Sequence, residues 1–153
     1  MTTPGPGTFE RGTDGPRILL VGIDGSPTSL RAAAYAAGLA RRQRSRLVAA
    51  YIAAPVSTWA AQLPDVVALQ TRANSELATE LAAQVAEGAE HVGVRVDFVT
   101  RDGDPFTELS RIADELPADC VFVGASEQGV HRLIGSLAVR LVRTGRWPVT
   151  VVP

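Results

Sequence analysis

Short apolar runs alternate with longer stretches of helical periodicity along almost the whole chain, and this alternation constrains the fold more than any other feature. The apolar runs, which predict strands, occupy residues 17–24, 47–53, 92–98, 120–123 and 149–152. The helical stretches run from 27 to about 44, from about 65 to 90, from 105 to 116, and onward from 136. Such alternation is typical of a parallel sheet with helices on both faces. We therefore expect an α/β fold with an open, five-stranded parallel sheet.

Helix-start signals and helical spacing support the expected helices. Ser26-Pro27 and Asp104-Pro105 each place an N-cap before a first-turn proline, and Ser136 opens the last helix. These caps accept hydrogen bonds from the free N–H groups at a helix start, where proline lacks only a donor that would be unpaired. The buried face of the second helix is predicted by apolar residues at helical spacing. They are Leu69, Ala73, Leu77, Leu81 and Val85.

Length and composition bound the class of protein. The chain has 153 residues and a net charge of −1, so no overall field draws it to nucleic acid or to a membrane. Glycine, proline and threonine dominate residues 1–16, which we expect to be a disordered leader before one domain at 17–153. A lone cysteine, Cys120, and the lack of a signal peptide or spanning segment favour the cytoplasm. Basic residues that are all arginine indicate a GC-rich bacterial genome.

Two positions at the ends of expected strands suggest a ligand site. Asp24 ends the first strand, and Gly124 ends the fourth, before a polar loop that leads to Gly135-Ser136 at a helix start. Ligands of open parallel sheets bind outside the carboxyl ends of the strands. A glycine-bearing loop at a helix N-terminus can present N–H groups to a phosphate. We expect Asp24 and Gly124 to flank one crevice.

Five short motifs, in this order, resemble those of the universal stress protein family. They are Ile23-Asp-Gly-Ser-Pro27, Gly103-Asp-Pro105, the segment from Ala118 to Ser126, Gly135-Ser136, and Pro148-Val-Thr-Val-Val152. The resemblance covers the whole chain except the leader. It implies a flavodoxin-like or adenine-nucleotide α-hydrolase-like fold with strand order 3-2-1-4-5. It also implies a stress-response homodimer, paired through Val149–Val152, an apolar strand that would otherwise be an unprotected edge.

The resemblance also implies a nucleotide site. Gly124, Gly135 and Ser136 match the phosphate-binding motif of family members that bind ATP, whereas Asp24 and the backbone of Ile52 match the adenosine side. Glu127 stands where the motif has its middle glycine, and the loop is shorter than the motif requires. A glutamate adopts positive φ poorly and brings a negative charge toward phosphate. ATP, AMP and cyclic AMP are the candidate ligands, and the last two need fewer phosphate contacts.

Each candidate residue also has a purely structural interpretation. Asp24 can cap the turn that follows it, Gly124 can serve only as a strand-end turn, and Ser136 can be an ordinary N-cap. The sequence contains no nucleophile elbow, no Walker loop and no residues at metal-ligand spacing. We therefore expect that the protein is not an enzyme and binds no metal ion. The alternative function is a stress protein that binds no nucleotide and acts through protein–protein contacts.

Overall fold

The computed structural model describes residues 15–125 and 136–153. Its five strands pair in parallel in the order β3-β2-β1-β4-β5, which confirms the predicted sheet. The strands are β1 (Ile18–Ile23), β2 (Arg46–Ala53), β3 (Val96–Asp102), β4 (Cys120–Gly124) and β5 (Val149–Val152). The helices are α1 (Pro27–Gln43), α2 (Pro64–Val92), α3 (Pro105–Glu115), α4 (Ser136–Thr144) and the short 3₁₀ helix η1 (Ala60–Gln62).

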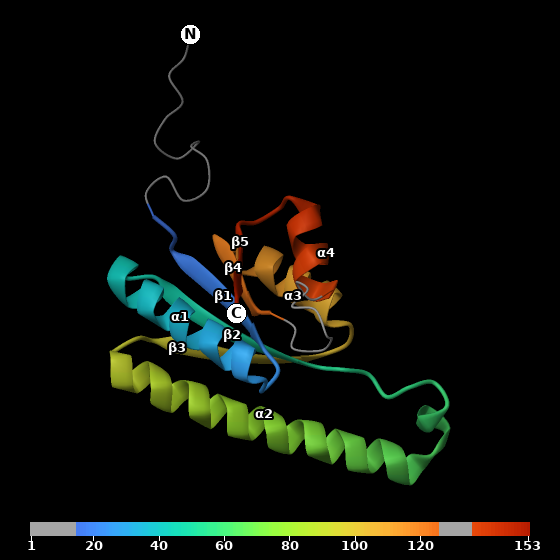
Figure 1. Cartoon of the computed structure of the whole chain (residues 1–153). Helices are drawn as coiled ribbons and strands as arrows, with labels where there is room; N and C mark the ends of the chain where they lie inside the picture. Colours follow the sequence, from blue (N-terminus) through green and yellow to red (C-terminus); the bar gives the residue numbers. More distant parts are fainter. Residues whose placement is uncertain (1–14, 126–135) are drawn as a thin grey trace.

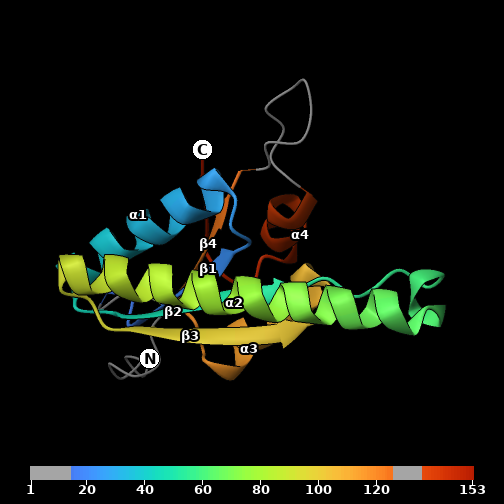
Figure 2. The same cartoon turned by 90° about the horizontal axis from the view of Figure 1, so that it is seen from below.

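Helices cover both faces of the sheet, and each face has its own core (Figures 1 and 2). Because successive side chains of a strand point to opposite faces, Leu19 and Val21 of β1 pack toward α1 and α2. Leu20, between them, packs instead with the buried residues of α3 and α4. All three are fully buried. A strand apolar on both faces therefore reflects two helical layers, as its continuous apolar run predicts.

The third strand begins later than its sequence pattern predicts. Val92 is the last residue of α2, and Gly93 ends that helix with a left-handed φ of 70°. β3 then runs from Val96 to Asp102, so the prediction of a strand over 92–98 was wrong at both ends. Alternating valines look alike in a strand and at the end of a helix, whereas a glycine C-cap requires the backbone to turn.

Helix α2 contacts the rest of the domain mainly through its C-terminal half. Its buried residues are Leu81, Val85 and Ala89, whereas Leu69 is 70% exposed. The prediction that Leu69 belongs to a buried face was wrong, because the N-terminal half of the helix, which contains Leu69, runs past the end of the sheet (Figures 1 and 2).

Among the described residues, no helix is both long and apolar enough to cross a membrane.

The first turn of α1 is fastened to the end of β4. Ser26 caps α1 by accepting a hydrogen bond from the Ser29 N–H at 3.2 Å. The buried Thr28 hydroxyl donates to the Ala125 carbonyl at 2.7 Å. Gly124 passes so close to this turn that a Cβ on it would lie 2.5 Å from the Thr28 carbonyl carbon and from the Ser29 nitrogen. Only glycine fits at this position.

We expect Gly124→Ala to destabilise the fold. The added methyl group meets backbone atoms that cannot rotate away, so α1 or β4 must shift, at a cost of about 1–3 kcal/mol in the free energy of unfolding. Urea denaturation measures the change. Gly38→Ala is the matched control: Gly38 lies inside α1 with nothing within 4 Å of its added Cβ, and this change should be neutral or slightly stabilising. Equal stability of Gly124→Ala and the wild type would contradict the close approach.

Candidate functional site

The carboxyl ends of β1 and β4 lie side by side, as the order of the strands requires. The two strands pair in parallel through Leu19↔Cys120 and Val21↔Phe122. The chain leaves β1 at Asp24 and β4 at Gly124, so the structure brings these two predicted residues to the same edge of the sheet. Thr28, in the first turn of α1, is hydrogen-bonded to Ala125, the residue that follows β4.

Asp24 is held in place by the turn that follows it. Its Oδ1 accepts a hydrogen bond from the Ser26 N–H at 2.9 Å, and its own N–H donates to the Ser29 hydroxyl at 3.3 Å. Partial burial raises the pKa of the carboxyl, but the hydrogen bonds of Ser26 and Ser29 outweigh burial and bring its pKa below the usual value. Asp24 is therefore a carboxylate at neutral pH, positioned in advance and exposed to solvent.

Ile52 lies at the same edge of the sheet. The β1–β2 pairing ends at Ile23↔Tyr51, so Ile52 is one residue beyond the end of β1 and still pairs with Arg101 of β3. Its side chain packs against the core on the α3 and α4 face. A ligand at the end of β1 would therefore meet the backbone of Ile52 rather than its side chain.

Tyr51 and Asp102 are two residues of this region that the sequence analysis did not single out. Burial raises the pKa of the Tyr51 hydroxyl, and the negative charges of Asp102 and Asp24 raise it further. The phenol is therefore protonated at neutral pH, with two carboxylates near it. The signal in the sequence was Asp102, an aspartate near the end of an expected strand as Asp24 is, but only the structure shows that both charges lie near one phenol.

The predicted phosphate side is described only in part. Gly135 and Glu127 lie outside the described residues, and Ser136 is the first residue of α4 that the structure describes. Arg140, on the same helix, pairs with Asp104 at 3.3 Å, and its guanidinium lies 4.1 Å from the centre of the Phe106 ring. This arginine joins α4 to the cap of α3, so its charge is directed to Asp104.

Two features of the described residues concern possible catalysis, namely metal-binding groups and the Cys120 thiol. Within the ranges 15–125 and 136–153, no group of three or more histidine, cysteine, aspartate or glutamate side chains could hold a metal ion. Burial raises the pKa of the Cys120 thiol, which keeps it in the unreactive protonated form. The arrangement offers hydrogen-bonding groups and a carboxylate, which can hold a ligand.

Comparisons with known proteins agree with this architecture. A universal stress protein of Methanocaldococcus jannaschii is 28% identical over 144 residues, which cover 88% of this chain and 80% of the relative. A universal stress protein family structure from Burkholderia pseudomallei is 27% identical and superposes with a TM-score of 0.73, covering 89% of this chain and 95% of that one.

A universal stress protein solved in complex with cyclic AMP is also similar. It is 25% identical, with a TM-score of 0.67 and coverage of 90% of this chain and 96% of that one. The sequence profile of the universal stress protein family matches residues 16–153, which is almost the whole chain. The chain therefore belongs to the universal stress protein family.

Proposed function

We propose that this protein binds an adenine nucleotide at the carboxyl ends of β1 and β4 and acts as a regulatory homodimer in the stress response of the cytoplasm. The ligand is a nucleotide with few phosphates, AMP or cyclic AMP, in preference to ATP. The protein binds the ligand without converting it. The observation that carries the proposal is Asp24, a pre-positioned carboxylate at the edge where open parallel sheets bind ligands.

The surroundings of Asp24 suit the sugar and the base of a nucleotide. A carboxylate accepts hydrogen bonds from ribose hydroxyl groups, and the backbone of Ile52 offers an amide and a carbonyl to a base. In the proposed site, Gly124, Gly135 and Ser136 face the phosphate. The complex of a similar protein with cyclic AMP supports a ligand of this class.

The second candidate function is a stress protein that acts through protein–protein contacts without a nucleotide. It is favoured by Gly124, whose lack of a side chain is already required by the first turn of α1. It is also favoured by Asp24, whose carboxylate already caps a turn. Both residues would be needed in a protein of this fold that binds nothing.

Calorimetry with AMP and cyclic AMP tests the proposal, and Asp24→Asn separates the two roles of the residue. Asparagine keeps an oxygen for the Ser26 N–H, so the turn survives, but it loses the charge that strengthens a bond from a ribose hydroxyl. We expect the affinity to fall about tenfold, because a charge-assisted hydrogen bond is about twice as strong as a neutral one. The free energy of unfolding should change little.

Asp97→Asn is the matched control for this experiment. Asp97 is also an exposed carboxylate of the sheet, but it pairs with Arg46 near the opposite ends of β2 and β3. Its replacement should leave nucleotide affinity unchanged. Wild-type protein that binds neither AMP nor cyclic AMP would exclude the proposed function and favour the second candidate.

Glu127→Gly tests the preference for few phosphates. Because Glu127 lies outside the described residues, the reason for this test comes from the sequence. The substitution restores the glycine of the family motif and removes a negative charge from the loop, so ATP should bind more tightly. The gain should be about fivefold or more, since two like charges a few ångströms apart cost about 1 kcal/mol in water. Calorimetry with ATP measures it. Unchanged ATP affinity would show that the length of the loop, rather than this charge, limits ATP binding.

The homodimer is proposed to form along β5. This strand lies at the edge of the sheet, and its residues are half-buried. Pro148 and Val152 direct their carbonyl groups to β4, where they accept from the N–H groups of Val121 and Ala125. Because successive residues of a strand point alternately to its two sides, Thr150 also faces β4, whereas Val149 and Val151 direct their N–H and C=O groups outward.

Val151→Pro should therefore convert the dimer to a monomer. Proline removes an outward N–H that the second copy would use, whereas proline at Thr150 would break the bonds to β4 inside one chain. Val151→Ala is the control, because it shortens the same side chain and keeps the N–H. Sedimentation velocity should show a monomer for Val151→Pro and a dimer for Val151→Ala. A dimer in both variants would place the interface elsewhere.

A further inference from the structure

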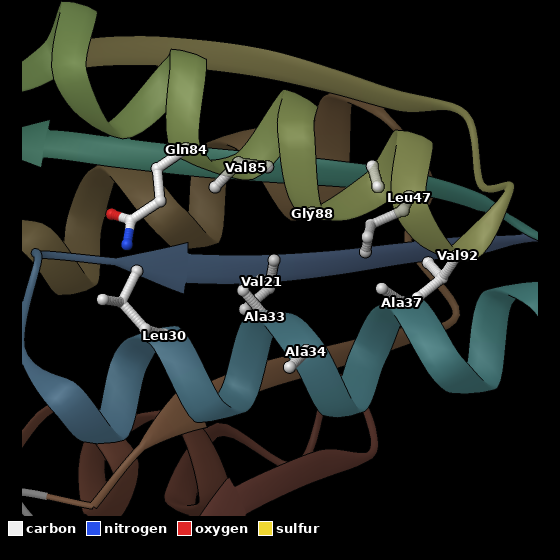
Figure 3. Close-up of a pocket in the computed structure, with 11 residues that line it drawn as sticks. Val21, Leu30, Ala33, Ala34, Ala37, Leu47, Gln84, Val85, Gly88 and Val92 are labelled. Carbon is white, nitrogen blue, oxygen red and sulfur yellow. The ribbon is translucent and has the colours of Figure 1, made fainter.

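A cavity lies between α1 and α2, above the strands that these helices cover (Figure 3). Its volume is about 190 Å³. The floor is formed by Val21 of β1 and Leu47 of β2, whose side chains are fully buried or nearly so. Asp24 is not among the residues that line it, so this cavity is distinct from the proposed nucleotide site.

The cavity exists because small residues face each other across the two helices. From α1 the walls are Ala33, Ala34 and Ala37, and from α2 they include Gly88 and Ala89. A Cβ added to Gly88 would meet nothing within 4 Å. These small side chains leave a space between the helices, and an apolar occupant would supply contacts that the lining lacks.

The chemistry of the lining restricts what can enter. Among the described residues that line the cavity, none is charged, and Gln84 is the one with a polar side-chain group. Figure 3 shows Gln84 reaching from α2 toward Leu30 of α1. Ala34, Gln84 and Gly88 are exposed to solvent, so the space opens to water between the helices. A charged ligand would lose its hydration here without gaining a partner, which excludes nucleotides from this cavity.

We propose that this cavity binds a small, neutral, largely apolar molecule with a single ring system, and that the Gln84 amide receives its one polar group. An enclosed apolar cavity of about 150 Å³ accepts benzene, so the present space, although open to water on one side, is large enough for a ring of that size. Burial of the ring against Val21, Leu47 and Val85 supplies the affinity. The amide can either donate or accept, so it fits a ring nitrogen or a hydroxyl.

Indole is a suitable probe, since it has an apolar ring system and one N–H. Titration of the full chain with indole should give saturable shifts of the methyl NMR signals of Val21, Val85 and Val92, which line the cavity. Gly88→Leu places a side chain in the space and should weaken indole binding about tenfold or more, because the ring loses its apolar contact area. Linear shifts without saturation, or shifts confined to other residues, would overturn the proposal.

Gly38→Leu is the matched control. Gly38 also lies inside a helix with nothing within 4 Å of an added Cβ, but it does not line the cavity. Both substitutions replace a helical glycine with a good helix former, so they affect helix propensity alike. Indole affinity should stay within about twofold of the wild type in Gly38→Leu, since the apolar lining is intact. Equal weakening in both variants would overturn the proposal.

A second pair of variants approaches the cavity from the other helix. Ala34→Leu fills the space from α1, whereas Ala83→Leu adds the same side chain at an exposed position of α2 outside the lining. Only the first should block indole. This pair decides the question if Gly88→Leu does not fold, and binding that survives Ala34→Leu would overturn the proposal.

Discussion

The contact between the first turn of α1 and the end of β4 is the constraint on which the candidate site depends. Gly124 lets the two backbones approach, and the Thr28 hydroxyl then bonds to the Ala125 carbonyl. The turn between β1 and α1, which carries Asp24, is thereby tied to the neighbouring strand as well as to its own. A side chain at position 124 would therefore disturb both the turn and the first turn of α1.

Because of this contact, the candidate residues are weaker evidence for a ligand than their positions alone indicate. A glycine at the end of β4 is expected where phosphate approaches the backbone, but here it is also required by a helix that packs on the strand. Asp24 likewise has a structural role without any ligand, because its carboxylate accepts a hydrogen bond from the Ser26 N–H in the turn. The specific evidence for a ligand is therefore the combination of an exposed carboxylate, its position at the strand ends and the family to which the chain belongs.

Much of the fold could be predicted from the sequence, because its signals are local. Apolar runs, N-caps and prolines identify the strands and most helix starts, and Ser26 and Asp104 cap their helices as predicted. The predicted start of β3 was wrong because Val92 and Val94 fit the pattern of a strand as well as that of a helix end. The contact of Gly124 with Thr28 and the cavity beside Gly88 depend on how distant segments pack, which no local pattern records.

The charges near the carboxyl ends of β1 and β3 give a physical reason to propose a ligand with few phosphates. The negative charges of Asp102 and Asp24 both raise the pKa of the Tyr51 hydroxyl, so two carboxylates lie near this side chain. Arg140 pairs with Asp104 and lies over the Phe106 ring, so a phosphate would compete with both for this guanidinium. Hydroxyl groups are attracted by such carboxylates, whereas each added phosphate is repelled by them. In the proposed site, a nucleotide that turned its ribose toward Asp24 would gain most, and one that carried a triphosphate would gain least.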